Sequence, residues 1–257
     1  MSMNSILKKI NPLYLEDLKS EDHFSVFINE PEYQIIILRG ISIKEDELAF
    51  LSKGFFVDEN LKVYHYDYVT EQLSESEFGF DKIHKILAPI YEKNNQIIDE
   101  FVSEIDKLED ELFERNTSRI FMDNWFDLKK DMARIERYYL RNYNVIQNVY
   151  KSMAGKEKFP DTHFKDLLQD VNYTQHHLNT QISRLDALYS YYGSLKNDKL
   201  NSNLYTLTVL SAVFLPLNLV VGFFGMNTEN LFFKDNPMGT KFVLMILVGS
   251  FLVSIFG

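Results

Sequence analysis

Small and polar residues interrupt an otherwise apolar segment near the end of this 257-residue chain. From Leu200 to Thr228 the sequence contains no Asp, Glu, Lys or Arg. A carboxamide in hydrocarbon is costly unless it meets a hydrogen-bonding partner or water, so its position carries information. The interrupting residues follow one another at steps of seven, three, seven and four, which places them on one face of a helix. They are Asn201, Thr208, Ser211, Asn218 and Gly222.

This polar stripe has two interpretations. A seam of small residues is common where membrane helices pack together. The other interpretation is an aqueous lumen, which Asn218 favours because a carboxamide is bulkier than a packing seam prefers. Pro216 precedes it closely and is expected to bend the helix. Leu207 or Leu215 would then form an apolar ring that closes the lumen by dewetting. One helix cannot enclose a lumen, so several copies must assemble around an axis.

The apolar segments predict a membrane domain over residues 200–257, since about 20 apolar residues span a bilayer core. The first span covers about 203–224 and the second about 241–257, joined by a loop over 225–240. The second is slightly short for a span, so we expect further chain beyond Gly257. The first twenty residues lack the apolar core of a signal peptide. We therefore expect a multi-pass protein with both termini in the cytoplasm.

Residues 1–77 predict a small N-terminal α/β domain in the cytoplasm. Short β-prone runs cover Phe24–Asn29, Tyr33–Leu38 and Lys62–Asp67, and a Glu-Pro-Glu turn separates the first two. Such runs, bounded by turn residues, are typical of strands. A short helix is predicted at Glu45–Ser52.

Residues 78–199 predict a helical bundle and a stalk helix, because apolar residues recur at steps of three and four. The first helix begins at Asp81 and runs for about 35 residues, and the second extends from Phe121 to about Met153. The third begins near Thr162 and meets no proline before Pro216, so it continues into the first span. The fold class is α+β. Taken alone, the three helices also fit a coiled coil without chemistry of its own.

Composition excludes several functions. The net charge of −10 argues against a nucleic-acid partner, which requires a basic face. The absence of cysteine excludes disulfides and thiolate metal sites. No nucleophile–base set, phosphate loop or dinucleotide fingerprint is found in the sequence, so we expect neither an enzyme nor an organic cofactor.

The first span ends in Phe224-Gly225-Met226-Asn227, after the run Phe-Leu-Pro-Leu at 214–217. A Gly-Met-Asn sequence at this position, followed within a short loop by a second span, resembles the CorA family of magnesium transporters, the two-transmembrane GMN family. Residues 105–112, Ile-Asp-Lys-Leu-Glu-Asp-Glu-Leu, are similar to the acidic helix of that family. Phe164-Lys165-Asp166 is similar to the start of its stalk helix. The resemblance covers about residues 80–257.

The resemblance implies a homopentamer with a cytoplasmic funnel in the cell (inner) membrane. Its cargo would be Mg²⁺, with Co²⁺ and Ni²⁺ as further candidates. Gly225, Met226 and Asn227 would form the selectivity filter, where carboxamides hold a hydrated Mg²⁺ that sheds water reluctantly. Pore-lining roles follow for the stripe and for the two leucines that could form the apolar ring. These residues are Asn201, Leu207, Thr208, Ser211, Leu215, Asn218 and Gly222.

Regulation and ion choice stay open at this point. Asp166 matches the family acid that binds regulatory Mg²⁺ between subunits. The partner acid of that site has no match in this sequence. The other interpretation of Asp166 is a solvated carboxylate in the first turn of a helix. The loop over 228–240 lacks the usual Met-Pro-Glu-Leu. A zinc-transporting branch usually reads Gly-Ile-Asn, so Met226 favours magnesium. The remaining alternatives are a Zn²⁺ or other transition-metal transporter and a membrane-anchored coiled-coil scaffold.

Overall fold

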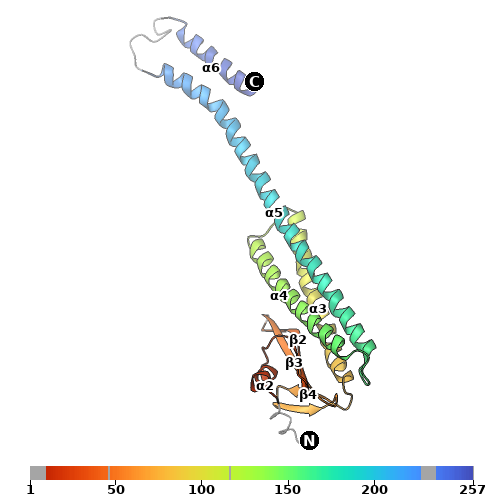
Figure 1. Cartoon of the computed structure of the whole chain (residues 1–257). Coiled ribbons are helices and arrows are strands. Elements are labelled where there is room, and N and C mark those ends of the chain that lie inside the picture. Colours follow the sequence, from red (N-terminus) through yellow and green to blue (C-terminus); the bar gives the residue numbers. More distant parts are fainter. Residues whose placement is uncertain (1–9, 46, 116, 227–235, 257) are drawn as a thin grey trace. The chain divides into compact units, whose positions relative to one another are not determined.

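The structure, a computed structural model, describes residues 10–45, 47–115, 117–226 and 236–256. The chain forms two compact units, Met1–Tyr189 and Ser190–Gly257. The first unit combines a sheet with long helices, and the second contains the apolar helical segments (Figure 1). The α+β class predicted from the sequence is therefore observed. The predicted domain boundaries at residues 77 and 199 stay predictions.

The described part of the first unit contains a five-stranded antiparallel sheet in which the strands follow their order in the chain. Two of its strands are long, and the other three are short. The strands are β1 (Val26–Asn29), β2 (Tyr33–Lys44), β3 (Glu47–Asp58), β4 (Val63–Asp67) and β5 (Gln72–Glu75). The three strand regions predicted from sequence are confirmed. The sheet is an antiparallel meander, which differs from the α/β arrangement predicted for this domain.

The short helix predicted at Glu45–Ser52 is wrong, because residues 47–52 begin strand β3. Strands β2 and β3 pair along their whole length, from Tyr33 opposite Asp58 to Lys44 opposite Glu47. This continuous ladder satisfies the backbone groups of both strands and outweighs the helical propensity of a Glu-Leu-Ala sequence. The helix α2 (Pro12–Lys19) and strand β5 were not predicted. Asn11 caps α2, where its side chain accepts a hydrogen bond from Leu13 N.

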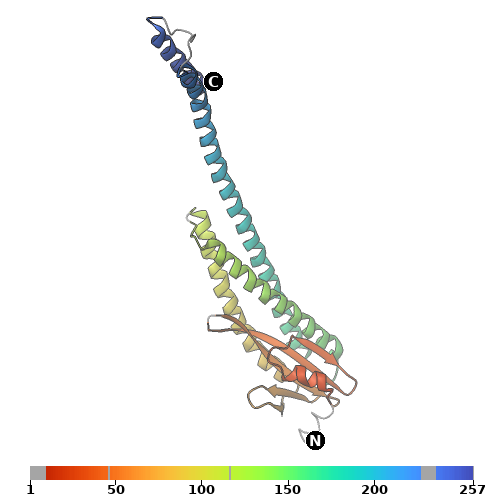
Figure 2. The ribbon, with the colours of Figure 1, turned by 90° about the vertical axis from the view of Figure 1, so that its left-hand side faces the viewer.

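Each face of the sheet is covered by a different set of helices (Figure 2). On one face, Leu18 of α2 lies against Gly54 of β3, where a Cβ would come within 2.6 Å of its Cδ1. On the other, Gly40 of β2 meets Ile90, where a Cβ would come within 2.3 Å of its Cγ2. Both glycines thus permit close packing of a helix on a strand.

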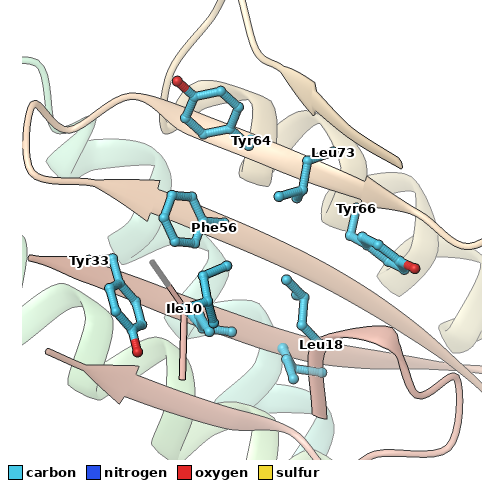
Figure 3. Packing of buried hydrophobic residues seen from close by; sticks show 9 residues of the cluster. Ile10, Leu18, Tyr33, Phe56, Tyr64, Tyr66 and Leu73 are labelled. Atoms are coloured by element: carbon cyan, nitrogen blue, oxygen red, sulfur yellow. The ribbon is translucent and has the colours of Figure 1, made fainter. Parts of the chain in front are cut away.

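The face toward α2 holds a compact apolar core (Figure 3). Its side chains come from alternate positions of the strands, as the period of two in a strand requires. Tyr33 stacks on Phe56 with ring centroids 5.7 Å apart. The buried members of this cluster are Ile10, Leu18, Tyr33, Ile35, Ile37, Phe56, Tyr64, Tyr66 and Leu73.

Four long helices follow the sheet: α3 (Asp81–Phe113), α4 (Phe121–Met153), α5 (Asp161–Phe224) and α6 (Gly239–Phe256). The three helices predicted from apolar periodicity and the second apolar segment are confirmed. Helix α5 runs without interruption from its amphipathic part into its apolar part, with Pro216 inside it.

Polar side chains join α5 to α3 and α4. Trp125 Nε1 of α4 donates to Leu185 O of α5 at 2.8 Å. Arg184 of α5 pairs with two carboxylates of α3, Asp106 at 2.7 Å and Glu109. Part of the acidic face of α3 is thus engaged in helix packing.

Candidate functional site

The apolar part of α5 is the most membrane-like element of the described chain. By length and composition, α5 is the one described helix that could cross a membrane, and the apolar stretch Gly239–Val253 of α6 is shorter. Large apolar side chains are exposed on several sides of α5, including Leu207, Leu215 and Leu219. A soluble surface rarely carries so continuous an apolar patch, so lipid or other copies of the chain must cover it.

Two hydroxyls of the polar stripe are satisfied within the helix itself. Thr208 Oγ1 donates to Leu204 O at 2.8 Å, and Ser211 Oγ donates to Leu207 O at 2.9 Å. A hydroxyl bonded to the carbonyl four residues earlier loses its donor but keeps oxygen lone pairs directed outward. Both side chains are therefore compatible with hydrocarbon, with helix packing and with a lumen.

Asn201 and Asn218 are exposed on the single chain, as Thr208 and Ser211 are, but they differ from the hydroxyls in the number of their polar groups. A carboxamide carries two donors and an acceptor, more than the backbone of its own helix can satisfy. In a membrane those groups require water or another helix. Gly222 lies on the same stripe, and nothing lies within 4 Å of a Cβ built on it. The structure thus keeps the stripe accessible, and its role in lining a pore stays a prediction.

Helix α5 ends immediately before the Gly-Met-Asn sequence. Gly225 N donates to Val221 O at 2.8 Å, and Met226 N donates to Phe223 O at 3.4 Å. A Cβ on Gly225 would lie only 2.9 Å from Val221 O, so a larger residue would have to shift this last turn. Met226 is exposed. Asn227, the predicted filter ligand, lies outside the described residues.

Asp166, the predicted regulatory ligand, is exposed near the start of α5. Asp170 follows one turn later, and burial together with repulsion by Asp166 raises the pKa of its carboxyl, while His84 opposes this shift. His84 stacks on His163 with ring centroids 4.8 Å apart. Within the described residues no group of three or more potential metal ligands lies together. A cation held by Asp166 would therefore need ligands from water or from another copy.

Sequence reasoning missed two groups of charged residues. The first is the pairing of Asp106 and Glu109 with Arg184, which a sequence cannot show because it joins two helices. The second is a set of arginines on one face of α4, Arg134, Arg137 and Arg141, whose steps of three and four were a visible signal.

Residues 5–256 match the family described as CorA-like Mg²⁺ transporter protein. The cobalt/magnesium transport protein CorA of Methanocaldococcus jannaschii is 23% identical over 250 residues, which cover 89% of this chain and 77% of that protein. The zinc transport protein ZntB of Yersinia enterocolitica is also 23% identical, over 83% of this chain and 69% of that protein. The YfjQ protein of Bacillus subtilis, named as a metal ion transporter, is 25% identical over 142 residues, which cover 52% of this chain but only 44% of YfjQ.

The solved structure of the complete CorA magnesium transporter from Methanocaldococcus jannaschii has a similar fold. Its TM-score is 0.77 at 20% sequence identity, over 99% of this chain and 85% of that one. Identity at this level supports the shared fold and leaves the ion open. Since the family match extends over nearly the whole sequence, the chain belongs to the CorA-like Mg²⁺ transporter family, as a membrane transporter of divalent metal ions and not an enzyme.

Proposed function

We propose that this chain assembles as a homopentamer whose α5 helices line a pore for divalent cations, with Mg²⁺ as the main cargo. The observation that carries the proposal is the polar stripe on the apolar part of α5. Its hydroxyls bond within the helix, whereas Asn218 and Asn201 keep exposed carboxamides. Rotational symmetry would bring five such stripes around one axis and supply the water that the carboxamides need.

The filter of this pore is Gly225, Met226 and Asn227. Gly225 N donates to Val221 O at 2.8 Å, and this bond closes the last turn of α5 directly before the proposed filter. Five copies of Asn227 would present carboxamide oxygens to the ion. Mg²⁺ keeps several waters when bound, and carboxamides can hydrogen-bond those waters without removing them.

Apolar rings and an acidic site would control the flow. Leu207 and Leu215, which are exposed on the single chain, form the narrow dewetted rings in the pentamer. Asp166 binds a regulatory Mg²⁺ with ligands from a neighbouring subunit. Repulsion between Asp166 and Asp170 favours this, because a divalent cation between subunits would relieve it. Both termini lie in the cytoplasm and the spans cross the cell (inner) membrane.

The choice of ion rests on the filter sequence. Relatives named for magnesium and for zinc have the same 23% identity, so overall similarity favours neither. The Met at position 226 favours Mg²⁺ over Zn²⁺, and Co²⁺ and Ni²⁺ are expected to compete because they also accept oxygen ligands at six-coordinate sites.

Uptake of Mg²⁺ into proteoliposomes tests the proposal. Purified protein is reconstituted around a Mg²⁺-sensitive dye, and the wild type is compared with Asn227→Ala. The matched control is Asn148→Ala, which makes the same change on the exposed side of α4. If the proposal is correct, the wild type and the control take up Mg²⁺, and the uptake rate of Asn227→Ala is lower by at least about tenfold. Equal uptake in all three proteins would show that Asn227 is not part of the filter.

Two further measurements separate the alternatives. Absence of uptake for every ion would favour a membrane-anchored scaffold. Uptake of Zn²⁺ that excess Mg²⁺ does not compete away would favour a zinc transporter. The mass of the detergent-solubilised particle tests the pentamer, and any other subunit number would require a different pore geometry.

A further inference from the structure

Four of the seven arginines of this acidic chain line one surface pocket. Arg39 comes from strand β2, and Arg134, Arg137 and Arg141 come from successive turns of α4. The cavity is about 200 Å³ in volume. Its remaining lining residues are Phe24, Ser25, Phe50 and Tyr138. In a chain of net charge −10, this concentration of positive charge requires an explanation.

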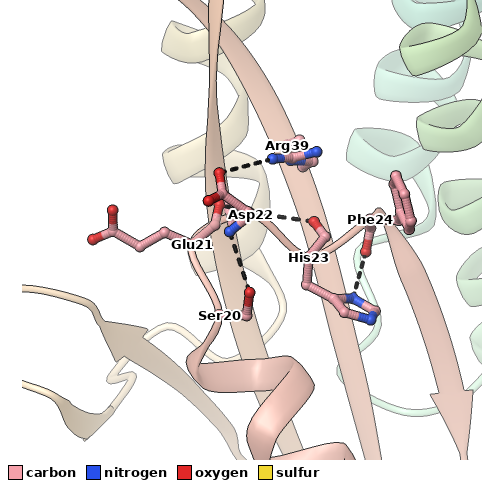
Figure 4. Close-up of polar contacts among 7 residues, drawn as sticks. Ser20, Glu21, Asp22, His23, Phe24 and Arg39 are labelled. Carbon is pink, nitrogen blue, oxygen red and sulfur yellow. Dashed lines mark hydrogen bonds and ion pairs between the residues drawn. The ribbon is translucent and has the colours of Figure 1, made fainter.

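Aromatic rings hold three of the guanidinium groups. The Cζ atoms of Arg39 and Arg134 lie 5.2 and 5.4 Å from the ring centroid of Phe50, and that of Arg141 lies 4.3 Å from Phe24. Figure 4 shows the Phe24 ring directed toward the helix beside it. A guanidinium carries its N–H donors in its own plane, so a ring that contacts its face leaves those donors available.

The carboxylates near the pocket do not balance its charge. Arg39 pairs with Asp22 at 3.5 Å, although the Asp22 side chain is 97% exposed (Figure 4). Arg134 pairs with Asp131 at 3.1 Å. Among the described residues, ion pairs reach only these two of the four guanidinium groups. Arg137 Nε instead donates to Ala133 O at 3.1 Å. About two positive charges therefore stay uncompensated.

Arg39 is the most buried of the four, with 11% of its side chain exposed. Within the described part of the chain its Nε is buried and has no hydrogen-bond partner. Burial lowers the pKa of the Arg39 guanidinium, Tyr138 and Asp22 oppose this shift, and the neighbouring Arg141 adds to it. A buried donor without a partner is costly, and an anion in the pocket would satisfy it while relieving the repulsion.

We propose that this pocket binds a compact multivalent oxyanion of the phosphate or polyphosphate class. Arginine forks match phosphate oxygens, and charge-assisted hydrogen bonds of this kind are the strong ones. The cavity suits an inorganic phosphate or diphosphate group better than a whole nucleotide, because guanidinium groups already occupy the faces of Phe24 and Phe50. The site lies outside the ion pathway of the proposed function and does not rest on it.

Titration calorimetry of the full-length protein with inorganic diphosphate tests the site. The buffer contains no divalent cation, because diphosphate would chelate it. The informative variant is Arg137→Gln/Arg141→Gln, since both side chains are exposed enough for the change to leave the fold intact. Arg119→Gln is the control, which removes an exposed arginine far from the pocket in sequence. An unchanged unfolding temperature verifies that each variant is folded.

We expect one diphosphate per subunit in the wild type and in Arg119→Gln, and binding at least about tenfold weaker in the double variant. Orthophosphate should bind more weakly than diphosphate, and acetate at the same concentration should not compete. Equal binding in the double variant would overturn the proposal. So would competition by acetate, which would indicate a general basic surface. A failure of diphosphate binding leaves Mg²⁺ uptake unaffected, so the two proposals fail separately.

Discussion

The carboxamide of Asn142 binds both backbone groups of Arg39. Asn142 Nδ2 donates to Arg39 O at 2.9 Å, and Arg39 N donates to Asn142 Oδ1 at 3.4 Å. Strand β1 pairs with β2 only as far as Ile37, so β1 does not reach Arg39, which pairs with Ser52 of β3 on its other side. A side chain of α4 thus replaces a strand at this edge and fixes α4 against the sheet.

Removing this carboxamide should destabilise the first unit. Asn142 is fully buried, and Ser25 Oγ also donates to its Oδ1 at 2.6 Å. In Asn142→Ala three polar groups lose their partner, and each buried unsatisfied group costs about 1–3 kcal/mol. We expect a clearly lower apparent unfolding temperature for the purified full-length protein. Asn148→Ala, on the exposed side of the same helix, should unfold like the wild type. Equal unfolding temperatures for both variants would contradict this role of Asn142.

Gly40 should tolerate no larger residue. A Cβ at this position would lie 2.3 Å from Ile90 Cγ2, so in Gly40→Ala the Ile90 side chain or the packing of α3 on β2 must shift. Overpacking of this kind costs about 1–3 kcal/mol, and Ile90→Ala in the same protein should recover part of the loss. Gly193→Ala in α5 is the control, because nothing lies within 4 Å of its Cβ and alanine favours a helix. Thermal unfolding of the wild type, Gly40→Ala, Ile90→Ala and the double variant gives the coupling between the two positions. Absence of coupling would mean that the clash is relieved elsewhere.

The long helices could be predicted from sequence because their signal is local. Apolar residues repeat every three or four positions over more than 30 residues, and turn residues separate the repeats. The hairpin of β2 and β3 could not be predicted in the same way. Whether residues 47–52 form a strand depends on pairing with residues 39–44, and a ladder is a property of two segments together. Helix α2 and strand β5 are too short for a periodic pattern.

Only part of the candidate site could be predicted from the sequence. The stripe from Asn201 to Gly222 follows from helical spacing alone, and α5 places those residues on one continuous helix. What the stripe faces depends on other copies of the chain, so its function as a pore lining stays a prediction. Asp106 and Glu109 lie in the acidic segment 105–112 that was noted in the sequence. Their pairing with Arg184 depends on how α3 packs on α5, which periodicity does not specify.

The pH dependence of stability should include a contribution from Asp170. Burial and the nearby Asp166 raise the pKa of its carboxyl in the folded protein above the usual 3.8. A raised carboxyl pKa means that the folded state holds the proton more tightly. Stability from this group is complete below about pH 4 and is lost as the pH rises through the raised pKa. Asp170→Asn should therefore flatten this part of the curve and raise the unfolding temperature at pH 7. A steeper dependence of stability on pH in Asp170→Asn would contradict the upward direction of this pKa shift.

Mg²⁺ should stabilise the protein through Asp166. If the ion binds beside Asp166 and Asp170 at a subunit boundary, its charge relieves their repulsion, and a ligand that binds only the folded assembly raises the unfolding temperature. The wild type should therefore show a rise with Mg²⁺ concentration that is much smaller in Asp166→Asn. Asp127→Asn, on an exposed part of α4, is the matched control and should respond like the wild type. The same response in all three proteins would assign Asp166 to the solvated surface, and the regulatory ion would then have to bind elsewhere.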